Sequence, residues 1–214
     1  MSVTYYIGGV DIATTYGVKV SASEGLLSRP NFSAPDSAKW PGYHGEVIDL
    51  SRRTFESRKI RLDCFISATT MSGFLEKIGT FLSAMDTPGT IRLMVVVDTE
   101  KPLVYEVYLS SGIDIQKQWS DGLNVGTFTI ELTEPAPLKR VVKVTGSSLS
   151  ITMTSSKLVD IFWGDGTSTR DISGTSAAST HTYPTSDTYY AIVAGAIDEI
   201  TGFSTSGTII WSKL

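Results

Sequence analysis

Apolar side chains recur at every second position in several runs of this 214-residue chain. Successive side chains of a β-strand point to opposite sides, so this spacing is typical of a strand with one buried face. The run 91–97 is apolar almost throughout and too short for a typical helix, so we expect a strand covered on both faces. These runs predict a mainly β protein. The alternating apolar positions are Ile60, Leu62, Cys64 and Ile66, then Leu103, Tyr105, Val107 and Leu109, then Phe128, Ile130 and Leu132.

One stretch of the chain has the spacing of a helix. Its apolar residues recur at intervals of three and four, which places them on one face of an amphipathic helix. Thr70 is a suitable N-cap, and Asp86, Pro88 and Gly89 provide the stop. We expect this single helix to pack on a sheet, so its apolar face has an architectural role. The apolar residues are Met71, Phe74, Leu75, Ile78, Phe81, Leu82 and Met85.

The composition of the chain changes at the Pro-Ala-Pro segment 135–137, which we interpret as a linker. Beyond it, 26 of the 74 residues 141–214 are Ser or Thr and few are charged. We therefore expect two domains, residues 1–137 and 141–214. The second segment has short strand-like runs over 141–145, 149–153, 158–163, 189–194 and 208–211, separated by turn residues. This pattern predicts a small all-β sandwich.

Charge and cysteine content exclude several classes of protein. Eighteen basic against 22 acidic side chains give a formal net charge of −4, which argues against a dedicated nucleic-acid binder. The single cysteine, Cys64, excludes an intrachain disulfide framework and a site of several thiolates. No apolar run approaches the roughly 20 residues of a membrane helix, and the first residues lack a basic signal-peptide region. We expect a soluble protein that folds in the cytoplasm, with no membrane partner and no specific nucleic-acid partner.

The densest positive feature of the sequence lies between residues 52 and 61. Acidic residues at 46, 49, 56 and 63 are interleaved with it. Paired charges, across strands or between subunits, therefore explain this cluster more simply than contacts with phosphates. Its basic members are Arg52, Arg53, Arg58, Lys59 and Arg61.

The sequence contains none of the common catalytic or cofactor motifs. It has no Gly-x-Ser-x-Gly element, no Cys-x-x-Cys pair and no phosphate-binding glycine loop. The two histidines, His44 and His181, lie on opposite sides of the linker, so a histidine-based triad would have to form across domains or in a single loop region. Asp160, Asp165 and Asp171 are candidate calcium ligands, but a turn aspartate more often caps its own backbone. We expect no catalytic residue, no cofactor and no metal site.

The first segment has an ordered layout. An opening strand contains Gly8 and Gly9, a glycine-bearing loop covers 40–49, and a strand begins at Arg58. The helix follows, then the later strands, and the last of them ends at Glu134 before Pro135. In this layout, residues 1–137 resemble the N-terminal domain of phage distal tail proteins, which are ring-forming adaptors between tail tube and baseplate. The resemblance implies a β-sandwich with a packed helix.

The same resemblance implies assembly into a homohexamer around a channel, with tube, hub and tape-measure proteins as partners. It also implies that the protein is located in the virion tail after assembly in the cytoplasm of a bacterial host. Arg52, Arg53, Arg58 and Arg61 would then supply contacts between subunits. Exposed ion pairs contribute only about 0–1 kcal/mol each, so apolar surface would provide most of the affinity.

The second segment contains Trp163, Gly164, Asp165 and Gly166, and later His181 and Tyr183. In these motifs, residues 141–214 resemble a small immunoglobulin-like domain of the PKD type. The resemblance implies that all six residues are structural. Trp163 would fill the core, the glycines would allow turn conformations, Asp165 would bind nearby amides, and Tyr183 would resemble a tyrosine corner. The chain departs from this pattern at Asp187, where the family usually has glycine.

These resemblances favour a structural phage or prophage tail protein, a subunit of a ring adaptor with an immunoglobulin-like appendage for protein or weak glycan contacts. A tail-tube subunit is an alternative. A glycan-binding or adhesion module is another, and it would use exposed aromatic side chains such as Trp40, Tyr43 or Trp211. A hydrolase is disfavoured because no acid–base pair can be named.

Overall fold

The computed structural model describes residues 3–51, 53–120 and 122–214. Its larger sheet has eight antiparallel strands in the order β2-β1-β7-β8-β10-β6-β3, and β9 pairs with β10 beside this path. The predicted mainly β fold with a packed helix is confirmed. The strands are β1 (Thr4–Ile7), β2 (Val10–Asp11), β3 (Val18–Glu24), β6 (Arg58–Ala68), β7 (Ile91–Val96), β8 (Leu103–Leu109), β9 (Gln116–Ser120) and β10 (Leu123–Glu134).

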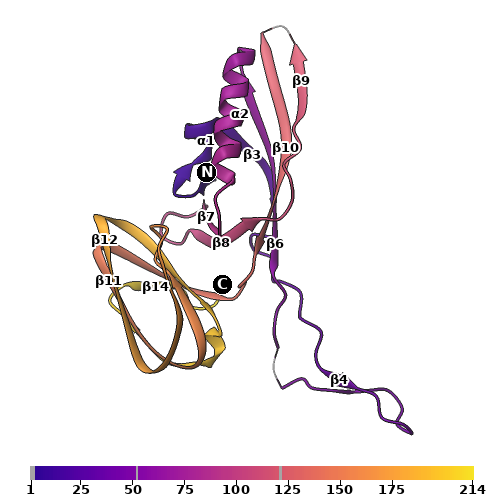
Figure 1. Cartoon of the computed structure of the whole chain (residues 1–214), viewed down its shortest axis with the longest axis vertical. Helices are drawn as coiled ribbons and strands as arrows, with labels where there is room; N and C mark the ends of the chain where they lie inside the picture. Colours follow the sequence, from indigo (N-terminus) through magenta and orange to yellow (C-terminus); the bar gives the residue numbers. More distant parts are fainter. Residues whose placement is uncertain (1–2, 52, 121) are drawn as a thin grey trace.

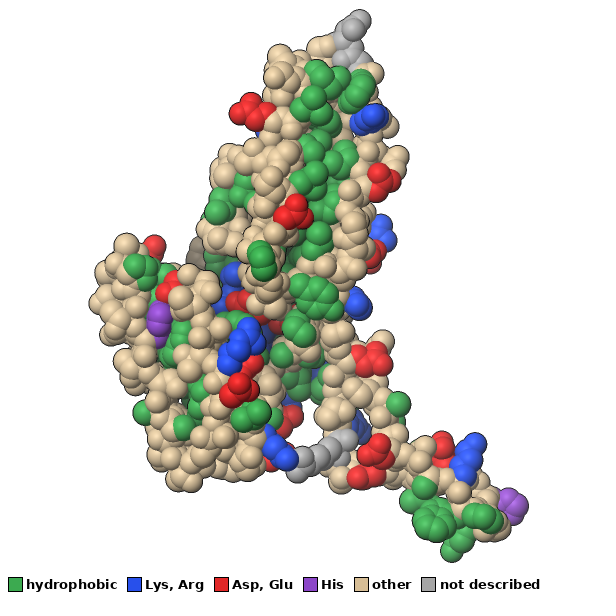
Figure 2. All heavy atoms as spheres, in the orientation of Figure 1, with side chains coloured by type: hydrophobic (Ala, Val, Ile, Leu, Met, Phe, Trp, Pro, Cys, Tyr) green, Lys and Arg blue, Asp and Glu red, His purple; other side chains and the backbone are tan. Residues whose placement is uncertain are grey.

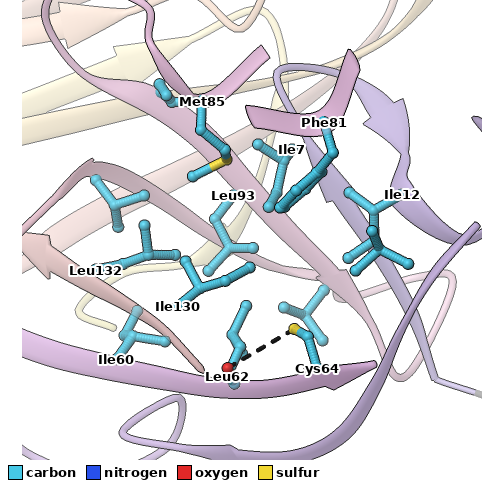
Figure 3. Packing of buried hydrophobic residues seen from close by; sticks show 14 of the residues in the cluster. Ile7, Ile12, Ile60, Leu62, Cys64, Phe81, Met85, Leu93, Ile130 and Leu132 are labelled. Carbon is cyan, nitrogen blue, oxygen red and sulfur yellow. Dashed lines mark hydrogen bonds between the residues drawn. The ribbon is translucent and has the colours of Figure 1, made fainter. Parts of the chain in front are cut away.

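The two-residue periodicity correctly predicted the buried faces of the long strands. β6 pairs with β10 along its whole length, and Ile60, Leu62, Cys64 and Ile66 of β6 are all buried. Figure 3 shows Ile60, Leu62 and Cys64 meeting Ile130 and residues of neighbouring elements in one core, to which Ile66 also belongs. β7 is less covered than expected, because its alternate positions are buried on one face and half-buried on the other.

The helix α2 (Met71–Met85) begins and ends where the sequence indicated. Thr70 is its N-cap, and the Thr70 Oγ1 atom accepts a hydrogen bond from the Gly73 N–H at 3.2 Å. Phe74, Phe81 and Met85 are buried against the sheet, where Phe81 and Met85 point into the core shown in Figure 3. The packing role predicted for this apolar face is confirmed.

A second, short helix, α1 (Ile12–Tyr16), escaped the sequence analysis. It has clear end signals, because Asp11 caps the Ala13 and Thr14 N–H groups and Gly17 ends it with a φ of 71°. Five residues are too few to produce a helical period, so the pattern alone could not reveal it.

The second sheet consists of β11 (Lys139–Phe162), β12 (Ser168–Gly195), β13 (Ile200–Thr205) and β14 (Thr208–Trp211), with a 3₁₀ turn at Ile197–Glu199. Its order is β12-β11-β13, and β14 also pairs with β11. Of the five predicted short strands, 208–211 is confirmed as β14, whereas the expected separation of the others was wrong. The chain stays paired with its partner across several register shifts, including one between Gly146 and Ser148, so three predicted strands form one continuous element. The Ser/Thr-rich stretch within β12 is also strand, although it was interpreted as turns.

The two sheets contact each other through a third apolar cluster that contains Val104 of β8 with Val141 and Ile192 of the second sheet. Trp211 packs at this contact, and its Nε1–H donates to the Pro102 carbonyl oxygen at 3.0 Å. Arg92 of β7 adds a polar link by donating to the Tyr190 carbonyl oxygen. Figure 1 shows the second sheet lying beside one end of the larger sheet.

Between β3 and β6 the chain leaves this body as an arm, which we define as residues 27–57. Figure 1 shows the arm projecting away from both sheets. Its strands β4 (Ser37–Ala38) and β5 (Val47–Ile48) form a separate two-stranded ladder. Within the described residues, no helix is both long and apolar enough to cross a membrane.

Candidate functional site

The arm is held in shape by its own backbone. In its outer part, the Asp49 N–H donates to the Asp36 carbonyl oxygen at 2.9 Å, and the Tyr43 N–H donates to the Trp40 carbonyl oxygen at 3.2 Å. No residue of the described arm is buried. A two-stranded ribbon that lacks a third layer has little stability of its own. The arm therefore lacks the burial that would normally stabilise it.

Aromatic and cationic side chains stiffen the middle of the arm. Phe32 and Phe55 form an isolated antiparallel bridge, and their ring centroids are 4.9 Å apart. The guanidinium carbon of Arg53 lies 5.4 Å from the Phe32 centroid, and that of Arg29 lies 5.3 Å from the Phe55 centroid. Such contacts contribute about 0.5–1 kcal/mol each at exposed sites. They hold the two sides of the arm together without covering its apolar surface.

The outward surface of the arm is strongly apolar. Seven of the 16 large hydrophobic side chains that are exposed in the described chain belong to it. Figure 2 shows hydrophobic side chains gathered at the end of the arm. Exposed apolar surface that is concentrated in this way usually marks a contact with another molecule. The seven residues are Leu27, Phe32, Trp40, Tyr43, Val47, Ile48 and Leu50.

The basic residues proposed for contacts between subunits occupy different environments. Arg53 is exposed on the arm. Arg61 is exposed on β6, where its Nε lies 3.1 Å from the Asp63 Oδ1 atom. Hydrogen bonds from Thr129 and Arg61 lower the pKa of Asp63. Arg52 lies outside the described residues. Only Arg53 and Arg61 are thus seen on the surface.

Arg58 belongs to the interior of the chain, because only 5% of it is exposed. Its Nη1 donates to the Leu26 carbonyl oxygen at 2.9 Å, and its Nε lies 3.1 Å from the Glu134 Oε2 atom. The Arg58 side chain is therefore bound within its own chain and does not reach the surface where a neighbouring subunit could contact it.

The motif residues of the second sheet form one connected structure. Trp163 is buried, its ring stacks on His181 with centroids 5.0 Å apart, and its carbonyl oxygen accepts the Tyr183 hydroxyl proton at 3.0 Å. Asp165 accepts hydrogen bonds from the N–H and the hydroxyl of Thr167 and lies 2.7 Å from His181. These contacts brace a turn against two strands, which is a structural use of each side chain.

The turn also depends on two glycines. Gly164 and Gly166 have φ angles of 104° and 90°, which side chains other than glycine rarely adopt. A Cβ atom at Gly164 would lie 2.9 Å from the Tyr190 carbonyl oxygen. The Tyr183 hydroxyl reaches a carbonyl 20 residues upstream in sequence. That separation is larger than the few residues typical of a tyrosine corner.

The aromatic residues considered for sugar stacking do not come together. Trp40 and Tyr43 are 61% and 77% exposed near the end of the arm. Trp211 lies half-buried between the two sheets, where its Nε1–H is bound to Pro102. Only the pair on the arm can stack on an external ring.

Titratable groups in the described residues form no recognisable catalytic arrangement. His44 is exposed on the arm, whereas His181 is bound to Asp165. Burial raises the pKa of the Cys64 thiol to about 12, which leaves little thiolate at neutral pH. No group of three or more His, Cys, Asp or Glu side chains that could hold a metal ion is found in the described ranges.

Comparison with solved structures shows a shared fold. The Dit protein of phage SPP1, described as a paradigm of the hub adsorption apparatus in phages that infect Gram-positive bacteria, aligns with a TM-score of 0.51 and 11% identity. The alignment covers 96% of this chain and 99% of that protein. At this identity the likeness establishes the fold and not the activity.

Two structures of the activated baseplate of phage p2, one with strontium and one with calcium, align less well. Both have TM-scores of 0.46, with 8% and 9% identity over 92% of this chain and 99% of theirs, and we base no argument on them. No protein-family model matches the sequence. No curated protein matches it either.

Sequence reasoning missed the arm, which it interpreted as a glycine-bearing loop. A usable signal was present. Trp40, Tyr43, Val47 and Leu50 recur at helical intervals of three and four, but Pro41, Gly42 and Gly45 among them argue against a helix. Apolar side chains in a segment that forms no regular helix have no evident place in the core of their own domain.

Proposed function

We propose that this protein is a structural, non-enzymatic subunit of a phage or prophage tail, which assembles with copies of itself into a ring that joins the tail tube to the baseplate. The observation that carries the proposal is the apolar arm, on a chain that shares its fold with a phage Dit protein over 96% of its length. The proposed location is the virion tail, reached after assembly in the cytoplasm of the bacterial host.

The physical argument begins with the direction of the arm. It points away from the body of its own chain, so its apolar side chains can be covered only by another molecule (Figures 1 and 2). If that molecule is a second copy, the arm of one copy contacts the two sheets of the next. Two different surfaces then meet, so the interface is heterologous. A heterologous interface with a suitable rotation closes into a ring. We propose a homohexamer, with Arg53 and Arg61 placed to add ion pairs at its rim.

We further propose that the chain works as two domains. Residues 1–137, with the larger sheet, α2 and the arm, would form the ring. Residues 141–214 would form an immunoglobulin-like appendage of the PKD type that contacts other tail or baseplate proteins, such as the tube, hub or tape-measure protein. Separate apolar clusters within the two sheets support this division.

Light scattering and negative-stain imaging of the full-length protein test the proposal. The wild type is expected to form rings of about six 23.1-kDa subunits as its concentration rises. A variant with Trp40→Ser, Tyr43→Ser and Leu50→Ser is expected to remain a monomer. Leu158→Ser, which removes an exposed apolar side chain of the second sheet, is the matched control and should still form rings.

Each other outcome has a definite meaning. A wild type that stays monomeric at high concentration overturns the ring. A triple arm variant that still forms rings removes the arm from the interface. Long stacks of rings instead of single rings would favour the alternative of a tail-tube subunit.

Glycan binding is a second candidate function, favoured by the two exposed aromatic rings that share one turn of the arm, those of Trp40 and Tyr43. Aromatic faces of this kind can stack on sugars. Titration with bacterial cell-wall polysaccharide measures it. Saturable binding that Trp40→Ser abolishes supports this function, whereas the absence of binding by the wild type removes it.

A further inference from the structure

A buried cluster of charged side chains lies where the arm, the larger sheet and the second sheet meet. Arg58 is the first residue of β6 and follows the arm directly. Its Nη1 donates to the carbonyl oxygen of Leu26, the residue before the arm, at 2.9 Å. Its Nη2 donates to the carbonyl oxygen of Pro137, in the connection to the second sheet, at 3.3 Å. One guanidinium thus binds the backbone of two segments that are far apart in the sequence.

The cluster continues into the second sheet through Glu134. One oxygen of Glu134 lies 3.1 Å from the Arg58 Nε atom, and the other accepts a hydrogen bond from the Lys139 ammonium group. Lys139 is the first residue of β11, and its side chain is fully buried. Burial raises the pKa of Glu134 and lowers that of Lys139, because it removes both charges from water.

Tyr105 of β8 links the last member of the cluster, Lys139, back to Leu26. The Lys139 Nζ atom lies 4.0 Å from the centroid of the Tyr105 ring. The Tyr105 hydroxyl donates to the Leu26 carbonyl oxygen at 2.6 Å, so that this carbonyl has both Arg58 and Tyr105 as donors. A path of direct contacts therefore runs from Leu26 through Arg58, Glu134, Lys139 and Tyr105 back to Leu26.

A buried ion cluster of this kind is poorly explained as a source of stability. Replacing such groups by well-packed apolar residues is often neutral or stabilising, whereas removing a single partner leaves an uncompensated charge. The cluster does fix the position of the root of the arm relative to the start of the second sheet. Movement of Arg58, Glu134 or Lys139 would leave a buried charge without its partner, which restrains the groups that these three side chains bind.

We propose that this cluster is a mechanical joint that couples the root of the arm to the start of the second sheet. When a partner molecule displaces the arm, the carbonyl of Leu26 shifts. Arg58 passes this shift to Lys139 through Glu134, and to the Pro137 carbonyl directly. The contacts that fix the start of the second sheet to the larger sheet are thereby weakened or strengthened. The joint belongs to a single chain, so the proposal does not depend on ring formation.

Hydrogen–deuterium exchange of the full-length protein, kept monomeric by low concentration, tests this coupling from both ends. Tyr105→Phe removes only the hydroxyl that binds Leu26, and exchange is followed at residues 135–141, which this hydroxyl does not touch. Glu134→Gln keeps the shape of the side chain but removes the charge, and exchange is followed at residues 24–29. Each variant is expected to accelerate exchange at the segment that the altered group does not touch by about fivefold or more, the scale of one lost hydrogen bond.

Arg61→Met is the matched control, because it removes an exposed ion pair from the same strand as Arg58. It should leave exchange at both segments unchanged. If Tyr105→Phe accelerates exchange only near Leu26, and Glu134→Gln only near Lys139, the two ends are independent and the joint is overturned. Tyr105→Phe keeps the aromatic ring and retains the buried charges, so it still provides a test if Glu134→Gln does not fold.

Discussion

The His181 Nε2 atom lies 2.7 Å from the Asp165 Oδ2 atom, and this contact ties the turn after β11 to the middle of β12. Asp165 is held from its other side by the N–H and the hydroxyl of Thr167. Burial raises the pKa of Asp165, but the hydrogen bonds from Thr167 and His181 outweigh this effect, so the pKa lies below its ordinary value of 3.8. The ionised carboxylate is therefore the form that the fold selects.

Asp165→Asn is expected to lower the free energy of unfolding at pH 7 by about 1–3 kcal/mol, because it weakens hydrogen bonds to a charged group. The pKa of Asp165 is depressed in the folded protein. Its contribution to stability is therefore present above about pH 3.8 and is lost as the pH falls through the folded value. In urea denaturation, the difference between wild type and variant should shrink in acid. Asp187→Asn is the control and should have a much smaller effect, because the exposed Asp187 carboxylate accepts a hydrogen bond from the adjacent Thr188 N–H.

Two glycines of the same turn should differ in their tolerance of alanine. Both have a positive φ, so either substitution strains the backbone by about 1–2 kcal/mol. At Gly164 the new Cβ would also lie 2.9 Å from the Tyr190 carbonyl oxygen, whereas at Gly166 it would meet nothing within 4 Å. Chemical denaturation should show Gly164→Ala to be the more destabilising by roughly 1 kcal/mol or more. Equal losses would contradict the close approach at Gly164.

Cys64 should be protected from thiol reagents in the folded protein. Only 3% of it is exposed, and burial raises its pKa to about 12. Since the thiolate is the reactive form, its reaction with a disulfide reagent at pH 8 should be at least about a hundredfold slower in buffer than in denaturing urea. Comparable rates in the two solutions would show that this part of the core opens readily.

Substitutions at the end of the arm should separate association from stability. Trp40 and Tyr43 bury little surface within the chain, so replacing both by serine should change the free energy of unfolding of the monomer by less than about 0.5 kcal/mol. Phe74→Ala, in the core beneath α2, is the contrasting variant and should cost about 3–5 kcal/mol. Thermal unfolding at low concentration measures both. A large loss from the arm substitutions would mean that the arm packs on its own body.

Local patterns predicted the parts of the fold whose causes are local. The alternation at Ile60, Leu62 and Ile66 gave the buried face of β6, and the Thr70 cap gave the start of α2. The continuity of β11 could not be predicted in this way. Turn-forming residues such as Gly146 ordinarily end strands, and here partners in β12, β13 and β14 keep the chain paired through its bends.

By itself, the sequence determined the mainly β class, the position of the helix and the identity of the residues in the turn at Trp163. Only the tertiary structure decided how the charge of Arg58 is accommodated. The two-residue period places Arg58 on the buried face of Ile60 and Arg61 on the opposite, exposed face, but it does not show what compensates the buried charge of Arg58. The physical reason is that a charge can be buried only where its counterion and its hydrogen-bond acceptors are buried with it. For Arg58 those groups are Glu134, Leu26 and Pro137, which only the folded chain brings to one place.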